Sequence, residues 1–395
     1  MASYMQMGHD TENLVGEKGC EDYSGLILSP VNRYPDELNT NVQEFRKKGD
    51  FHIVLDPQLY FPRTERQKLL EHPYFPSDLD TADISSFGWW QDIVTNLSGY
   101  AASLNCDAIC TPVVLPKVFS DEYYSVATEI GRQSAEQAYE YKLTALQSII
   151  VDIQQLTDMN KVMTYASICS NNECVGYYLV LLIDSEPRRE YSDADALFGA
   201  MCLVRELENT GKPVLVSNCS SDVLLYKAAG ASHVATGKFF NLRRFTKSRF
   251  DEPSEGGGGQ LAYWFENSLL AFLRQADLLR LRNNGYERLL GKLHSDGFWA
   301  QKILQQFAQA PDKPWVALGW RQYLSWFSRT EALLDQAVAL ETARQWTKEA
   351  EDAWKELEED DIFMEERKND GNWIRSWRQA ISSFRKNSRM ISTAH

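Results

Sequence analysis

The sequence lacks any apolar run that approaches the roughly 18 residues of a membrane-spanning helix. Its first residues, MASYMQMGHDTENLVGEKG, are polar and acidic and do not show the basic-then-apolar order of a secretory signal. The 395 residues are 44% hydrophobic and 24% charged, a composition typical of a globular protein and not of a disordered chain. We therefore predict a cytoplasmic protein that makes no contact with a membrane.

Several motifs that carry known chemistry are also missing. No G-x-G-x-x-G follows the first apolar run, and the chain has no G-x-S-x-G, H-E-x-x-H, Walker or EF-hand pattern. The seven cysteines are an odd number scattered from Cys20 to Cys219, and their spacings do not suit a tetrahedral zinc site. We predict reduced thiols, no metal site and no cofactor.

The first 280 residues instead repeat one pattern, in which a short apolar run is followed by a polar joint and an amphipathic segment of helix length. The apolar runs lie at 25–31, 51–56, 106–114, 143–151, 175–184, 212–218 and 231–237, and the helical segments near 36–48, 88–104, 120–140, 156–170, 193–210 and 221–229. Strands that are almost continuously apolar are buried on both faces, as in parallel sheets covered by helices. The pattern predicts an α/β fold.

Two α/β architectures fit this pattern, a (β/α)8 TIM-like barrel and an open doubly wound parallel sheet. The missing glycine fingerprint of dinucleotide-binding open sheets favours the barrel. Because only seven strands are visible, we expect the eighth within 261–282, although this stretch also has the pattern of a helix. The expected organisation is a flexible tail over 1–19, a barrel over 20–285 and a helical C-terminal domain or cap over 286–395.

The last quarter of the chain is rich in tryptophan, holding eight of the eleven. Apolar residues recur mostly every three or four positions from Trp320 to Leu357, which predicts one helix of about 40 residues. A helical cap on the barrel explains this region. The alternative is a docking surface for a protein partner, since exposed Trp and Arg dominate interfaces.

Two carboxylates follow buried apolar runs, Asp56 in IVLDPQLY and Asp184 in YLVLLIDSEP. A buried carboxylate is costly unless it is partnered or used. In a barrel, the carboxyl ends of the strands meet at one mouth, so both side chains are candidate catalytic groups for acid–base or nucleophilic chemistry. The competing interpretation is that each one caps a neighbouring loop.

A basic cluster follows the run at 231–237, although the net charge of the chain is −14. It consists of Lys238, Arg243, Arg244, Lys247 and Arg249. Loops after the seventh and eighth strands of barrels commonly bind phosphate, so this position predicts an anion site. The predicted ligand-binding residues at this and neighbouring strand ends are Lys238, Asn241, Arg243, Arg244, Gln58, Tyr60 and Asn218. Nucleic acid is an alternative ligand, with phenylalanines of the cluster as stacking faces, and internal ion pairing of the arginines is a third explanation.

Two functions follow from these features. The first is an enzyme that binds a phosphate- or nucleotide-containing ligand at the barrel mouth and cleaves or exchanges a glycosidic or phosphoester bond. The second is a non-catalytic scaffold or assembly component that binds a protein or nucleic acid through the Trp-rich tail and the basic cluster. Gly256 to Gly259, next to this cluster, belong either to a lid or to a disordered loop.

Overall fold

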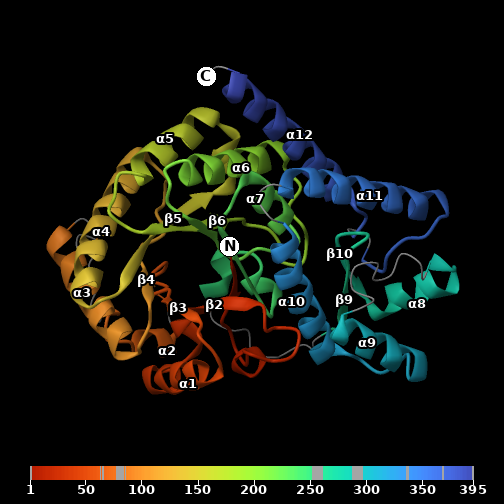
Figure 1. Cartoon of the computed structure of the whole chain (residues 1–395), viewed down its shortest axis with the longest axis horizontal. Helices are drawn as coiled ribbons and strands as arrows, with labels where there is room; N and C mark the ends of the chain where they lie inside the picture. Colours follow the sequence, from red (N-terminus) through yellow and green to blue (C-terminus); the bar gives the residue numbers. More distant parts are fainter. Residues whose placement is uncertain are drawn as a thin grey trace.

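The computed structural model describes residues 2–62, 64, 66–76, 84, 86–250, 261–286, 297–334, 338–366 and 369–393. Eight parallel strands close into a barrel in chain order, β1 to β8 (Figure 1). They are β1 (Ala2–Gln6), β2 (Tyr23–Leu28), β3 (His52–Leu55), β4 (Ala108–Cys110), β5 (Thr144–Asp152), β6 (Gly176–Leu182), β7 (Val214–Val216) and β8 (His233–Gly237). The TIM-like barrel is confirmed, and the open sheet is excluded.

Helices follow most of the strands and cover the outside of the barrel. They are α1 (Pro35–Lys48), α2 (Gln67–Leu70), α3 (Phe87–Ser103), α4 (Asp121–Glu140), α5 (Met159–Cys169), α6 (Ala194–Glu208) and α7 (Val223–Ala229). The strands are short and apolar because both faces are enclosed: all seven residues of β6, for example, are buried. Short 3-10 helices connect several elements, among them 240–242 and 247–250 after β8.

The expectation that residues 1–19 form a flexible tail is wrong, because residues 2–6 are β1 and close the barrel. Met5 pairs with Leu26 of β2 on one side and with Thr236 of β8 on the other. The run ASYMQ was missed because Ser3 and Gln6 are polar, yet both are buried. The eighth strand therefore does not lie within 261–282, where the structure has the hairpin β9 (Tyr263–Glu266) and β10 (Ala271–Arg274), followed by α8 (Gln275–Asn283).

The C-terminal helices are α9 (Phe298–Gln309), α10 (Val316–Leu333), α11 (Ala339–Glu359) and α12 (Asn372–Thr393). The single helix expected from Trp320 to Leu357 is wrong, because the helical conformation ends at Leu333 and a separate helix begins at Ala339. The apolar period runs through both helices because each buries one face, but α10 packs on the barrel strands and α11 packs on α7 and α12. Periodicity alone does not detect such a change of partner.

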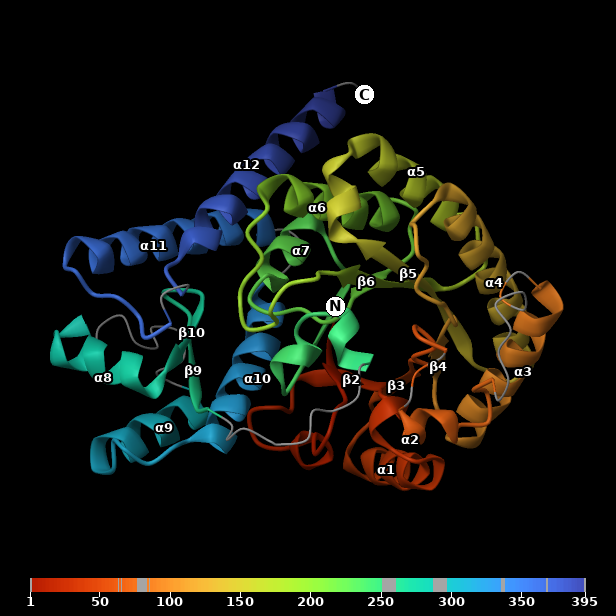
Figure 2. The same ribbon diagram turned by 180° about the vertical axis from the view of Figure 1, so that it is seen from behind.

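α10 lies against β1 and β8, and α12 runs across α6 (Figures 1 and 2). Polar contacts join these layers: the Tyr23 hydroxyl donates to the Leu324 carbonyl at 3.0 Å, and Lys227 of α7 forms a buried ion pair with Glu331 of α10 at 2.8 Å. Six C-terminal tryptophans are buried in these packed layers, namely Trp299, Trp315, Trp326, Trp354, Trp373 and Trp377. Among the described residues, none of the helices combines the length and hydropathy needed to cross a membrane.

Candidate functional site

Asp56 lies directly after β3, at the carboxyl end of the barrel. It is 2% exposed, and its carboxylate accepts hydrogen bonds from the Gln58 backbone N–H at 3.0 Å and from the Tyr60 hydroxyl at 2.9 Å. The Tyr178 hydroxyl, from β6, donates to it at 3.3 Å. Burial raises the pKa of Asp56 to about 6, while these hydrogen bonds and the charge of Arg249 oppose the shift. A carboxyl group with this pKa exchanges a proton readily near neutral pH.

Side chains from five parts of the chain meet around Asp56. We call the mouth cluster the set Gln6, Ser29, Asp56, Tyr60, Tyr178 and Arg249. Gln6 donates from Nε2 to the Tyr178 hydroxyl at 3.5 Å, and Arg249 donates from Nη2 to the Ser29 hydroxyl at 3.2 Å. All six residues are buried. The cluster therefore joins the carboxyl ends of β1, β2 and β3 and the interior face of β6 to the segment that follows β8.

That segment covers the mouth of the barrel. Phe245 forms an isolated parallel bridge with Leu182, which extends β6, and the Ile183 N–H donates to the Phe245 carbonyl at 3.1 Å. The rings of Phe245 and Phe250 lie edge-on to Tyr60, with centroids 5.0 and 5.5 Å away. The phenylalanines thus enclose Asp56 and shield it from water.

Gln58 and Asn218, both predicted to bind ligand, have left-handed backbones with φ of 55°. The Gln58 side chain is held within the protein, because its Oε1 accepts from the Val31 N–H at 3.0 Å and its Nε2 donates to Ser29 at 3.0 Å. Asn218 donates from Nδ2 to the Leu242 carbonyl at 3.2 Å. Left-handed non-glycine residues cluster at functional sites, and both of these residues lie at the barrel mouth.

The two arginines of the predicted anion site are buried and bonded internally. Arg243 donates to the carbonyls of Gly237 at 3.0 Å and Lys238 at 2.7 Å, and its guanidinium lies 3.7 Å from the ring centroid of Tyr323. Burial lowers the pKa of Arg243 to about 10. Arg244 pairs with Glu190 at 3.4 Å and donates to the Ser185 hydroxyl and to the carbonyls of Glu186 and Arg189.

Glu190 belongs to a polar network that sequence patterns did not reveal. Its Oε1 accepts from the hydroxyls of Ser220 at 2.9 Å and Ser221 at 2.6 Å, at the end of β7. Asp222, in the same loop, is fully buried, and burial followed by the negative charge of Glu190 raises its pKa to about 7. The positive charge of Arg244 therefore compensates two carboxylates, and this explains why it is buried.

Lys238 lines an open cavity of about 360 Å³ at the barrel rim, which we call the rim cavity. Its Nζ lies 4.0 Å from the Trp320 ring centroid and 4.9 Å from that of Phe239, and it donates to the Asp10 carbonyl at 3.3 Å. Burial lowers the pKa of Lys238. The rim cavity is lined by Arg188, Lys238, Phe239, Phe240, Arg243, Leu261, Tyr263, Phe272, Gly319 and Trp320.

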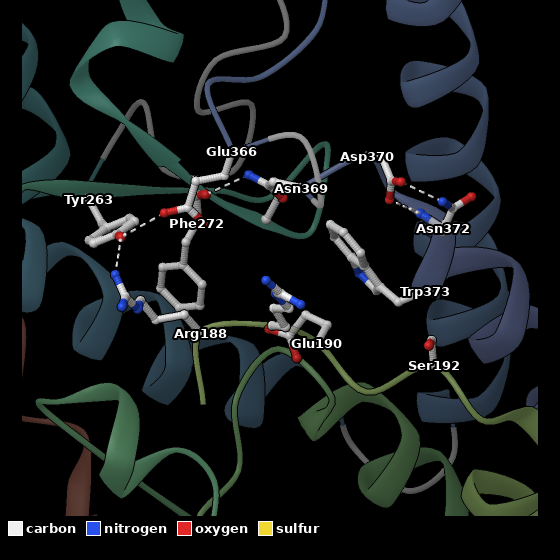
Figure 3. A pocket seen from close by; sticks show the side chains of 12 residues that line it. Arg188, Glu190, Ser192, Tyr263, Phe272, Glu366, Asn369, Asp370, Asn372 and Trp373 are labelled. Atoms are coloured by element: carbon white, nitrogen blue, oxygen red, sulfur yellow. Dashed lines mark hydrogen bonds between the residues drawn. The ribbon is translucent and has the colours of Figure 1, made fainter. Parts of the chain in front are cut away.

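A second cavity of about 230 Å³ adjoins the rim cavity and shares Arg188, Tyr263 and Phe272 with it. Figure 3 shows Arg188 and Glu190 on the barrel side of this cavity, with Tyr263 and Glu366 across it. The Arg188 guanidinium donates to the Tyr263 hydroxyl at 3.5 Å. Arg188, Tyr263 and Trp320 were not predicted, because they come from a loop, the hairpin and α10, and no local motif marks them.

The structure therefore divides the predicted site residues into separate groups. Asp56 and Tyr60 lie together in the mouth cluster with Gln58 beside them, and Lys238 and Arg243 line the rim cavity. Asp184 and Asn241 are exposed, so Asp56 and Asp184 do not share one environment. Arg63, at the end of the run that contains Asp56, and Gly256 to Gly259 lie outside the described residues.

Within the described ranges, no group of three or more His, Cys, Asp or Glu side chains is arranged to hold a metal ion. Tyr178 is the most informative residue that sequence reasoning missed. It stands in the otherwise aliphatic run YLVLLI, where a phenol pointing into a barrel needs a polar partner.

Comparison with models of protein families finds no match, and no curated protein sequence matches the chain. Solved structures that resemble it include a D-psicose 3-epimerase, with 10% identity, a TM-score of 0.37 and coverage of 60% of this chain and 84% of that one. The tryptophan synthase complex of Pyrococcus furiosus is similar at 16% identity and a TM-score of 0.33, over 60% and 86% of the two chains. A type I 3-dehydroquinate dehydratase from Clostridium difficile is similar at 9% identity and a TM-score of 0.33, over 60% and 84%. The barrel assignment rests on the strand order of this chain itself.

Proposed function

We propose that the protein is an enzyme that binds an anionic, ring-bearing ligand, such as a phosphorylated or nucleotide-like small molecule, in the rim cavity. The observation that carries this proposal is the lining of the cavity, where the ammonium group of Lys238 lies among aromatic faces within an open space of about 360 Å³. Ammonium and guanidinium groups bind phosphate, and aromatic rings stack on planar ligands.

Lys238 retains binding capacity in this arrangement. An ammonium group has three N–H donors, and within the described part of the chain Lys238 makes one hydrogen bond, to the Asp10 carbonyl. Arg188 brings a second cation to the cavity; it pairs with Glu186 at 3.1 Å, and its side chain is 43% exposed. Arg243 also lines the cavity and adds positive charge, although its guanidinium is bonded to carbonyls. The charge of the cavity thus favours an anion despite the acidic net charge of the chain.

The proposed chemistry is cleavage or exchange of a glycosidic or phosphoester bond, with Asp56 as the acid–base group. Its enclosure, its two tyrosine partners and its pKa of about 6 support this role. We assign no second carboxylate, because Asp184 is exposed. The segment with Phe245 and Phe250 must move to admit a reacting group to Asp56.

The binding proposal is tested by titration calorimetry of the whole chain with inorganic phosphate, nucleoside monophosphates and sugar phosphates. Lys238→Met keeps the aliphatic stem on Trp320 and removes the charge. We expect it to weaken binding about tenfold or more, since a hydrogen bond to a charged group contributes about 1.5–3 kcal/mol. Lys348→Met, on the exposed face of α11, is the matched control and retains wild-type affinity.

Equal affinity of the Lys238→Met variant and the wild type for every bound compound would refute the rim-cavity assignment. A single-stranded oligonucleotide belongs in the same titration, because nucleic acid presents the same combination of phosphate and ring. Binding that needs several linked nucleotides would assign the cavity to nucleic acid. The scaffold function receives less support, since six of the C-terminal tryptophans are buried within the protein and do not form an exposed docking surface.

A further inference from the structure

The mouth cluster contains one buried hydrogen-bond acceptor that has no donor, beside a buried carboxylate. Gln6 is fully buried, and its Oε1 has no hydrogen-bond partner, although its Nε2 reaches the Tyr178 hydroxyl. Asp56 offers a carboxylate in the same place, bonded to the two phenols and one backbone N–H. A buried acceptor without a donor is unfavourable, so Gln6 Oε1 favours a donor-bearing group beside the Asp56 carboxylate.

The protein supplies one donor-bearing group of its own, the guanidinium of Arg249. Its charge is felt by Asp56, Tyr60 and Tyr178, but within the described residues it forms no ion pair, and its side chain donates a hydrogen bond to the Ser29 hydroxyl. A guanidinium has five N–H donors. The guanidinium of Arg249 therefore occupies the mouth cluster but forms no hydrogen bond with Gln6 Oε1 or the Asp56 carboxylate.

The backbone that carries Arg249 is held by contacts that are separate from its guanidinium. Arg66 donates from Nη2 to the Arg249 carbonyl at 2.8 Å, and Thr64 donates to the Phe250 carbonyl at 3.3 Å. The same stretch of chain begins at Lys238, in the rim cavity. Removal of the Arg249 head group therefore leaves the cover of the mouth attached at both ends.

We propose that the mouth cluster is a ligand subsite for a cationic N–H donor group of the guanidinium, amidinium or ammonium class, whose place Arg249 holds in the unliganded protein. Asp56 and Gln6 are the acceptors of this subsite, and Tyr60 and Tyr178 orient the carboxylate. The subsite is distinct from the rim cavity and does not depend on anion binding there.

The test uses Arg249→Ala in the full chain, with methylguanidinium as the probe and thermal unfolding as the readout. At ten times its Kd, a ligand that binds only the folded state raises the Tm of a chain of this length by about 2 °C. We expect this rise in Arg249→Ala, and a smaller rise in the wild type, where the probe must displace Arg249. N-methylurea, a neutral probe of the same shape, is expected to give no rise.

The double variant Arg249→Ala plus Asp56→Asn is expected to lose the response to methylguanidinium. Arg249→Ala plus Lys238→Met is expected to keep it, which separates this subsite from the rim cavity. If the alanine variant does not fold, Arg249→Gln takes its place in the same measurement. Absence of a rise in both single variants, or an equal rise without the Asp56 carboxylate or with the neutral probe, would overturn the proposal.

Discussion

The variant Asp56→Asn removes a carboxyl group whose ionisation the fold makes unfavourable at neutral pH. Burial raises the pKa of this carboxyl group from 3.8 to about 6, so the folded state binds the proton more tightly than the unfolded state does. A raised carboxyl pKa stabilises the folded protein fully at low pH, and this contribution is lost as the pH rises through about 6. The asparagine side chain does not titrate, so the variant lacks this loss.

The magnitude follows from the two pKa values. The full difference between 3.8 and about 6 corresponds to about 3 kcal/mol, because one pKa unit is about 1.4 kcal/mol. At pH 5 about 1.4 kcal/mol of this remains, and at pH 8 almost none does. The free energy of unfolding of the wild type should therefore fall by about 1.4 kcal/mol more than that of Asp56→Asn between pH 5 and pH 8.

Urea unfolding followed by tryptophan fluorescence at several pH values measures this difference. Other titrating groups, such as Asp222, are common to both proteins and cancel in the comparison. Asp184→Asn is the matched control, because Asp184 is exposed, and it should keep the pH dependence of the wild type. If Asp56→Asn has the same pH dependence as the wild type, the reasoning that places an unfavourable buried charge at Asp56 is refuted.

Three further predictions concern stability. Lys227→Met leaves Glu331 without its ion-pair partner in the interior and should lower the free energy of unfolding, measured in urea, by about 3–5 kcal/mol. The double variant Lys227→Met plus Glu331→Gln should lose less stability than the sum of the two single variants. Gly199→Ala should destabilise by about 3 kcal/mol or more, because its Cβ would lie 1.8 Å from the Leu156 carbonyl oxygen, and Gly88→Ala should be close to neutral. A chain that ends at residue 285 should aggregate in size-exclusion chromatography, because α10 covers β1 and β8; a monodisperse product would contradict this packing.

The barrel could be predicted from the sequence because its strands are apolar throughout. Seven runs, from 25–31 to 231–237, each overlap one strand of the structure, since burial on both faces leaves a run of apolar residues that is visible in isolation. β1 escaped because its two polar residues are paired from outside the strand: Ser3 reaches Glu331, and Gln6 reaches Tyr178. A strand that carries buried polar side chains with partners on distant residues has no local apolar signature.

The candidate site could be predicted only in part, for a related reason. Asp56 and Lys238 were identified because each follows an apolar run, so their place at the strand ends is a local property. Arg188 and Trp320 line the cavity with Lys238 but come from parts of the chain 50 and 82 positions away from it, and no motif links them. Their proximity is a consequence of packing between the barrel and α10.

The cationic side chains of the basic cluster lie in different surroundings, although they follow one another closely along the chain. The ammonium group of Lys238 lies at an open cavity, whereas the guanidinium groups of Arg243 and Arg244 donate hydrogen bonds to carbonyls and to Glu190. Arg249 lies at the far end, over acceptors that it does not match. Sequence position alone treats these cations as one anion site, but the structure places one at an open cavity, two in internal contacts and one in the mouth cluster.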